Sequence, residues 1–318
     1  MIPVRTLRLC LAIVLSGASV VHAAAPMVRT QAPGYYRMML GDFEVTALSD
    51  GTVALPVNQL LTNTTPARVD RALAGSGLSS PLETSVNAYL INTGDKLVLV
   101  DTGAAGLFGP TLGRLAENLK AAGYQPAQVD EIYLTHMHAG HVGGLTSNGA
   151  MVFPNAVVRA DRADASYWLS ETNLSRAKND EKAAFEGARS ALHPYIEAHR
   201  FRPFDGRTQM AAGITALPRH GHTAGHSTYL VESRGQTLVL WGDLMHVAAV
   251  QFDNPAVTIS FDSNSRAAAV QRKRAYADAA SNGYLVAGAH ISFPGIGRVR
   301  ANGRGYMWLP VNYSVPNR

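Results

Sequence analysis

Three histidines lie within six consecutive positions of this chain, at His136, His138 and His141. The chain has 11 histidines in 318 residues, so a cluster this dense is not expected from composition alone. Imidazole suits zinc and other borderline transition metals, and catalytic zinc sites use about three protein ligands plus water. Alternation places His136 and His138 on one side of an extended segment. The cluster therefore predicts a metal site, and the alternative is a group of loop histidines satisfied by hydrogen bonds.

The histidine segment follows a short apolar run, and runs of this kind recur between turn signals. Their length and β-branched content predict strands at 43–48, 86–91, 97–100, 132–134, 157–160, 228–231, 238–241 and 284–287. Turns at 92–95 and 233–236 predict two hairpins. Helical periodicity predicts helices at 112–122, 161–170, 177–192 and 266–280. Hairpins interleaved with helices predict sheets covered by helices.

Two of the apolar runs resemble each other. Residues 97–103 read Leu-Val-Leu-Val-Asp-Thr-Gly, and residues 238–244 read Leu-Val-Leu-Trp-Gly-Asp-Leu. Each run places a carboxylate, Asp101 or Asp243, just past the end of a strand. This weak internal echo is consistent with two similar halves.

The histidine segment resembles the HxHxDH signature of the metallo-β-lactamase superfamily, which is followed downstream by a ligand His, a bridging Asp and a last His. His222 lies in Arg-His-Gly-His-Thr-Ala-Gly-His-Ser, Asp243 in Leu-Trp-Gly-Asp-Leu-Met-His, and His290 in Ala-Gly-Ala-His-Ile-Ser-Phe-Pro-Gly-Ile-Gly. These contexts are similar to the methyl parathion hydrolase and lactonase-like branch. The resemblance implies an α/β fold, the four-layer αββα sandwich of the superfamily.

The resemblance also implies six metal-ligating residues and one or two Zn²⁺ per chain, with other divalent transition metals left open. The first metal would be held by His136, His138 and His222, and the second would face His141 and His290, with Asp243 bridging the two. Asp243 and His290 are accordingly expected to be catalytic. Such a metal lowers the pKa of bound water from 15.7 to about 7, so that hydroxide attacks the substrate at neutral pH. Asp101 is expected to orient the histidine loop.

One position departs from the signature, because Gly140 stands where the superfamily has its Asp. The resemblance assigns that Asp to the second metal. Three interpretations follow: the first metal acts alone, the second binds weakly through the remaining ligands, or the protein is a weakly active metal-binding member. We favour weak binding of the second metal.

The other histidines have less specific roles. His226 and His246 lie near the predicted ligands in sequence, and they either support the site or contact substrate, or serve ordinary packing. His220 is similar. His193 and His199 are expected at the surface.

Three aromatic residues are candidates for a substrate pocket. Taken alone, Phe108, Trp168 and Phe185 read as core residues. The resemblance implies instead that they form an aromatic pocket for a leaving group, which suits neutral aryl esters, lactones and organophosphate triesters. The expected function is hydrolysis of such small molecules. A β-lactamase is the nearest enzymatic alternative, and a non-catalytic metal-binding protein is the alternative outside enzymes.

The amino-terminal residues read as a targeting segment. Arg5 and Arg8 precede an apolar run, and small residues follow it, which predicts a signal peptide at residues 1–25 with cleavage after Ala23 or Ala25. The run is shorter than the roughly 20 residues of a spanning helix, so no stable membrane anchor is expected. Residues 26–35 are expected to be a flexible lead-in and 36–318 a single hydrolase domain. The single cysteine of the chain, Cys10, lies within the predicted leader, so neither disulfides nor thiolate ligands are expected in the mature protein, which we expect to be periplasmic or secreted.

The charge balance is mild. The whole chain carries a formal net charge of +5, and the leader contributes two of the positive charges. The one dense basic run, Arg272-Lys273-Arg274, is expected to be a solvated helix surface, so no nucleic-acid partner is expected. The expected partner is a small-molecule substrate, and a homodimer is left open.

Overall fold

Two β-sheets form the centre of the fold in this computed structural model, which describes residues 25–315. The six-stranded sheet has the order β1-β2-β4-β5-β6-β9, and the seven-stranded sheet has the order β10-β11-β12-β13-β15-β16-β17. Strands of the first sheet are β1 (Tyr35–Leu40), β2 (Phe43–Leu55), β4 (Leu82–Asn92), β5 (Leu97–Val100), β6 (Glu131–Tyr133) and β9 (Val157–Arg159). Strands of the second are β10 (Thr208–Ala211), β11 (Ile214–Pro218), β12 (Ser227–Ser233), β13 (Gln236–Leu240), β15 (Leu285–Ala287), β16 (Ile296–Asn302) and β17 (Gly305–Pro310).

Two short strand pairs and nine α-helices complete the described residues. The pairs join β3 (Leu61–Thr62) to β14 (Thr258–Ile259) and β7 (Thr146–Ser147) to β8 (Ala150–Met151). The helices are α1 (Val57–Leu60), α2 (Pro66–Gly75), α3 (Leu115–Ala121), α4 (Ala139–Val142), α5 (Arg162–Trp168), α6 (Glu171–Arg176), α7 (Asn179–Glu197), α8 (Ala248–Gln251) and α9 (Ser265–Asn282).

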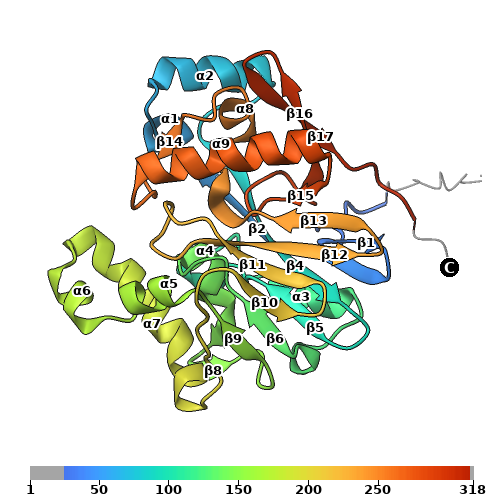
Figure 1. The fold of residues 1–318 in the computed structure, drawn as a ribbon, viewed down its shortest axis with the longest axis vertical. Helices are drawn as coiled ribbons and strands as arrows, with labels where there is room; N and C mark the ends of the chain where they lie inside the picture. Colours follow the sequence, from blue (N-terminus) through green and yellow to red (C-terminus); the bar gives the residue numbers. More distant parts are fainter. Residues whose placement is uncertain (1–24, 316–318) are drawn as a thin grey trace, which may run out of the picture. The chain divides into compact units, whose positions relative to one another are not determined.

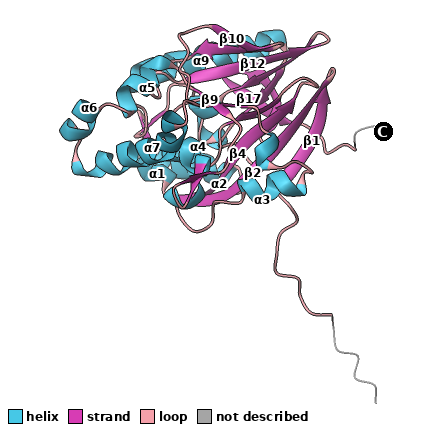
Figure 2. Cartoon of the chain, turned by 90° about the horizontal axis from the view of Figure 1, so that it is seen from below, coloured by secondary structure: helices cyan, strands magenta, loops and turns pink. Residues whose placement is uncertain are grey.

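The apolar residues of the central strands form three interfaces between four packed layers. Val98 and Val100 of β5 face the second sheet, whereas Leu97 and Leu99 pack with side chains of α3, α5 and α7. In the second sheet, Val239 of β13 packs with residues of α9. Figure 1 shows α9 along one sheet and α3, α5 and α7 beside the other, and Figure 2 shows the strands and helices of the same fold from below. These layers confirm the predicted αββα sandwich.

Parallel pairing aligns the ends of four strands that matter for the chemistry. β5 pairs in parallel with β6, and β13 pairs in parallel with β15. The carboxyl ends of parallel strands meet at one edge of a sheet, so the loops that follow them are neighbours. Asp101 follows β5, the histidine segment follows β6, Asp243 follows β13 and His290 follows β15.

Each of the eight predicted strands and four predicted helices overlaps an observed element. The helix predicted from residue 112 begins at Leu115 instead. Gly113 precedes it with a φ of +92°, a left-handed conformation that a helix cannot include. The helix predicted to end at 192 continues as α7 to Glu197.

The prediction of a solvated basic run was wrong at one of its three positions. Arg272 is fully buried, while Lys273 and Arg274 are exposed. The physical reason is helical spacing, because Arg272 falls on the α9 stripe that also buries Ala268 and Ala275.

The described residues cover only part of the amino-terminal segment for which we made predictions. The predicted signal peptide lies outside the described residues except for Ala25. A compact unit begins at Pro33, and its first strand begins at Tyr35, within the segment predicted as a lead-in. Across residues 25–315, none of the helices has the length and apolar character that a membrane crossing requires.

Candidate metal centre

The histidine segment turns from an extended loop into a short helix. β6 ends at Tyr133, the chain stays extended at His138, and α4 begins at Ala139. His136 and His138 therefore project from the loop, and His141 projects from the first turn of α4. The Asp101 carboxylate fixes this transition by accepting hydrogen bonds from the Thr135 backbone N–H at 2.7 Å and the Thr135 hydroxyl at 2.8 Å.

Three loops of the second sheet supply the remaining donors. His222 lies between β11 and β12, Asp243 in a single 3₁₀ turn after β13, and His290 after β15. Gly242 has a φ of +54°, and a Cβ there would lie 2.8 Å from Thr135 Cβ and 2.9 Å from His226 Nε2. Only glycine lets this loop approach the histidine segment so closely.

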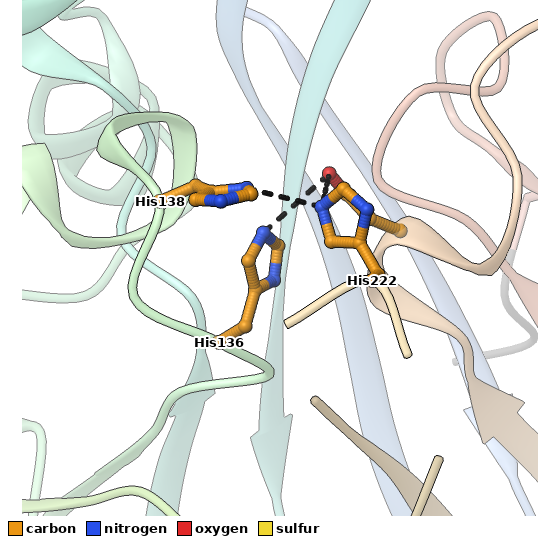
Figure 3. Close-up of side chains that lie close together, drawn as sticks. His136, His138 and His222 are labelled. Carbon is orange, nitrogen blue, oxygen red and sulfur yellow. Dashed lines mark hydrogen bonds and ion pairs between the residues drawn. The ribbon is translucent and has the colours of Figure 1, made fainter. Parts of the chain in front are cut away.

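Four side chains converge on one point. His136, His138, His222 and Asp243 each offer a donor atom, and these atoms lie within 4.8 Å of one another. His138 Nδ1 lies 3.0 Å from His222 Nε2, and the latter lies 3.3 Å from Asp243 Oδ2. Figure 3 shows the three imidazoles pointing toward one another, His136 and His138 from one loop and His222 from another. This group could hold a metal ion.

A second group lies on the other side of the same carboxylate. His141 Nε2 and His290 Nε2 each lie 3.2 Å from Asp243 Oδ1, and the three donors also lie within 4.8 Å of one another. Asp243 thus faces one group with Oδ2 and the other with Oδ1. The structure brings together all six residues singled out in the sequence.

The donor set fits a cation rather than a closed hydrogen-bond network. His136 Nε2 and Asp243 Oδ1 are buried and have no hydrogen-bond partner among the described residues. Buried polar atoms without partners are costly, and an ion bound between them would satisfy both. Imidazole and carboxylate donors with no thiolate suit zinc and similar divalent transition metals.

Hydrogen bonds fix three imidazoles by their outer nitrogens. His141 Nδ1 lies 2.7 Å from Asp101 Oδ2, His222 Nδ1 lies 2.8 Å from Asp262 Oδ1, and His290 Nδ1 lies 2.9 Å from the Ser85 carbonyl oxygen. Each contact needs the proton on Nδ1 and leaves Nε2 to face the centre. Such partners orient the ring and increase the basicity of a ligand.

Burial and mutual charge set the protonation of the centre without metal. Burial and the neighbouring His141 hold the pKa of His136 well below its usual value, and burial and His222 do the same for His138. Burial opposes ionisation of Asp243, but His141 and His290 outweigh it and hold its pKa low. Two neutral imidazoles and an ionised carboxylate are therefore present at neutral pH, which are the forms that bind metal.

His141 differs from the other imidazoles of the centre. Burial by itself lowers its pKa, but the carboxylates of Asp243 and Asp101 outweigh burial and raise the pKa to about 10. Both ring nitrogens lie against a carboxylate oxygen. Binding of a cation by His141 therefore requires release of a proton.

Asp164 holds two of the loops together, a role that the sequence analysis missed. Its carboxylate accepts hydrogen bonds from the Met137 N–H at 3.0 Å and the Gly225 N–H at 2.6 Å. Met137 lies between two of the converging histidines, and Gly225 lies three residues after His222. Burial raises the pKa of Asp164 to about 6. The sequence signal was the polar residue on the buried face of α5.

The remaining histidines separate into supporting and peripheral residues. His226 Nε2 accepts the Asp243 backbone N–H at 3.0 Å, and His246 Nε2 lies 3.1 Å from Asp243 Oδ2. Both rings are buried. His220 lies 3.3 Å from Asp161, outside the centre. The structure places His193 and His199 at the surface, as expected.

The three aromatic candidates occupy different positions. The Trp168 ring lies against His138 in a T-shaped contact, with centroids 5.2 Å apart, and against Phe185 at 4.7 Å. Trp168 and Phe185 are buried in the core cluster between the first sheet and its helices. Phe108 is 41% exposed and follows a 3₁₀ turn. Trp168 thus touches the centre, and a pocket formed by all three stays a prediction.

Gly140 lies in α4 between the residues that face the two groups. Its φ is not positive, and a Cβ built there would contact nothing within 4 Å. The backbone therefore accepts a side chain at this position. The left-handed conformation that would have required glycine here is absent.

Comparisons with known proteins agree with this geometry. A family model described as the metallo-beta-lactamase superfamily matches residues 82–280. An N-acyl homoserine lactonase of a Bacillus species is 26% identical over 210 residues, which are 60% of this chain and 76% of that protein. A probable metallo-hydrolase of Mycobacterium tuberculosis is 24% identical over 204 residues, which are 57% of this chain and 63% of that protein.

Solved structures give the same picture. A hydrolase of the beta lactamase superfamily, AbOPH, is 35% identical with a TM-score of 0.85, covering 90% of this chain and 100% of its own. The structure of AidC, described as a dizinc quorum-quenching lactonase with a bound product, has a TM-score of 0.82 at 22% identity. It covers 89% of this chain and 99% of its own, and at this identity it supports the fold alone.

Proposed function

The chain belongs to the metallo-beta-lactamase superfamily, and we propose from this premise that it is a metal-dependent hydrolase of small molecules with ester, lactone or organophosphate triester bonds. The observation that carries the proposal is the division of Asp243 between two donor groups. That arrangement serves a hydrolase that needs no serine or cysteine nucleophile.

The six converging side chains are proposed to be the metal ligands. We assign His136, His138 and His222 to one Zn²⁺, and His141 and His290 to a second, with Asp243 shared between them. Bound there, zinc would supply a water of lowered pKa and a Lewis acid for the carbonyl or phosphoryl oxygen.

The side chains around these ligands keep the centre ready for that chemistry. Asp101 holds His141 by Nδ1. Trp168 packs against His138 in a T-shaped contact and supports its ring. Asp243 is proposed to fix the spacing of the two halves of the centre, and His290 to complete the second half at the carboxyl end of β15.

The proposed substrate class rests on the relatives and on the surface near the centre. The Bacillus relative is named a lactonase, and AbOPH is named a hydrolase. Phe108 and Leu107 are both exposed in the loop after Asp101, and they offer apolar surface to an acyl or aryl group. We propose Phe108 as a residue that contacts the substrate.

Export is a separate part of the proposal, and it rests on the amino-terminal sequence alone. We propose that the protein acts in the periplasm or outside the cell after removal of residues 1–25. Amino-terminal sequencing of the protein recovered from its native compartment tests this. A mature protein that still begins at residue 1 would contradict export.

The function is tested with metal-free protein reconstituted with zinc. The substrates are an aryl ester, an N-acyl homoserine lactone, a dialkyl aryl phosphotriester and a β-lactam. We expect zinc-dependent turnover of at least one of the first three, loss of turnover in His222→Ala, and unchanged turnover in Lys273→Ala, which alters an exposed residue of α9. Turnover of the β-lactam alone would identify a β-lactamase.

Gly140 supports one alternative, a metal-binding protein with little or no activity. It removes the anionic side chain that the signature places beside the second group. This alternative predicts tight zinc binding without turnover of any of the four substrates above the rate of the His222→Ala variant.

A further inference from the structure

Arg272 is the only lysine or arginine that is buried among residues 25–315. It lies in α9, on the side of the second sheet away from the first, and its side chain has no exposed surface. A buried guanidinium is costly unless hydrogen bonds and a counter-charge compensate it. The groups around Arg272 therefore indicate the role of this buried charge.

The guanidinium donates to the loop that follows Asp243. Nε donates to the Leu244 carbonyl oxygen at 2.5 Å, and Leu244 is the residue directly after Asp243. Nη1 donates to the Val257 and Pro255 carbonyl oxygens at 2.6 and 3.2 Å. One side chain thus fixes both ends of the segment between Asp243 and β14.

The same guanidinium faces the carboxylate that holds His222. Nη2 lies 3.9 Å from Asp262 Oδ2 and has no hydrogen-bond partner. Asp262 Oδ1 lies 2.8 Å from His222 Nδ1, and its Oδ2 accepts the Ile259 N–H at 3.2 Å. The Asp262 side chain is fully buried, and of the described residues Arg272 is the one lysine or arginine paired with it.

We propose that Arg272 is a positioning residue of the metal centre. It lies against Asp262, which holds His222, and at the same time holds Leu244, so that His222 and Asp243 keep their mutual geometry. Among the described residues no hydrogen bond or ion pair joins Arg272 to a metal ligand directly, so its effect passes through Asp262 and through the backbone after Asp243. The inference rests on the proposed ligand assignment and not on the substrate class.

The test measures zinc affinity of the metal-free protein in competition with a chromophoric chelator. Loss of the direct partner of a ligand lowers metal affinity by about 10- to 100-fold, and because Arg272 lies one step behind such a partner, we expect a weakening at the lower end of this range, about 10-fold, for Arg272→Met. Arg272→Lys should recover part of the affinity, because an ammonium supplies the charge but cannot reach Leu244 and Val257 together. The control is Arg274→Met, an exposed position of the same helix, which should bind zinc like the wild type.

A double-mutant cycle separates this role from general stability. Asp262→Asn keeps the shape of the side chain and removes its charge. If Arg272 acts through Asp262, adding Asp262→Asn to Arg272→Met should weaken zinc binding by much less than the product of the two single effects. The Co²⁺-substituted proteins should also show altered visible absorption, which reports ligand geometry.

Two results would overturn the proposal. One is wild-type zinc affinity in folded Arg272→Met, and the other is multiplication of the two single effects in the double variant. If Arg272→Met does not fold, Arg272→Lys and Asp262→Asn decide, and wild-type zinc affinity in both refutes it. Because no substrate enters these measurements, failure of every hydrolysis assay would leave them unaffected.

Discussion

Restoring an aspartate at position 140 should tighten the second metal. In Gly140→Asp, the new carboxylate would project from the first turn of α4, between His138 and His141. The built Cβ meets no atom within 4 Å, and the backbone is not left-handed. Glycine and aspartate differ by only a few tenths of a kcal/mol in helix propensity, so the metal-free variant should unfold within about 0.5 kcal/mol of the wild type.

The gain should appear when zinc is added. The second group has one carboxylate and two imidazoles, and that carboxylate also faces the first group. A direct anionic ligand should contribute at least as much as a partner behind a ligand, which is about 10- to 100-fold in affinity. This corresponds to about 1.4–2.8 kcal/mol. We expect the second zinc to tighten by this factor and the first to change little.

The assay is titration of metal-free protein with zinc against a chelator, with bound metal counted after gel filtration. Gly140→Asn has nearly the same shape without the charge, and Gly140→Ala isolates the backbone effect. Both should bind zinc like the wild type. The reasoning would be refuted if a folded Gly140→Asp variant bound the second zinc with an affinity within threefold of the wild type. The protein would then be adapted to the ligands that it already has.

Three further predictions concern other residues. Asp243→Ala should weaken zinc binding at both groups by at least about 100-fold, which competition titration measures, and loss at one group alone would contradict its shared role. Phe185→Ala should lower the free energy of unfolding by about 3–5 kcal/mol with little change in KM, because the ring is buried in the core. A raised KM with little loss of stability would instead place Phe185 in the substrate pocket. Burial raises the pKa of Asp164 from 3.8 to about 6, so its contribution to stability is full below pH 4 and is lost as pH rises through 6. Urea unfolding of the metal-free proteins should therefore show the wild type losing about 2 kcal/mol relative to Asp164→Asn between pH 4 and 7, and parallel pH curves would exclude this.

The sequence predicted the parts of the site that have a short-range pattern. His136, His138 and His141 are close in the chain, and Asp243 and His290 follow apolar runs that are recognisable as strands. The periodicity and the ends of strands depend on neighbouring residues, so they can be predicted from the sequence alone. The parallel pairing that makes these ends neighbours could not be derived from the residues, and the structure supplies it.

Asp262 and Asp164 were missed, unlike Asp101, because their roles depend on pairings far apart in the chain. Asp262 reaches His222 across 40 positions, and Asp164 reaches Met137 across 27. No local spacing identifies these partners, although Asp164 is a polar residue on the buried face of α5. Arg272 is different, because its spacing from Ala268 and Ala275 placed it on the buried stripe of α9. The charged run at 272–274 led to the prediction of a solvated surface, whereas the helical spacing of Arg272 indicated burial.

The charges around the centre explain why a cation belongs there. Asp101, Asp164, Asp243 and Asp262 are all buried within reach of the imidazole cluster, whereas Arg272 is the one buried guanidinium of residues 25–315. Hydrogen bonds make these carboxylates tolerable, and a protonated His141 between Asp101 and Asp243 offsets only part of their charge. A divalent ion removes the remaining imbalance at the point where Asp243 Oδ1 and His136 Nε2 have no hydrogen-bond partner. Folding and metal binding should therefore be coupled, since the same carboxylates that repel one another in the metal-free protein are the ones that hold the ligands in place.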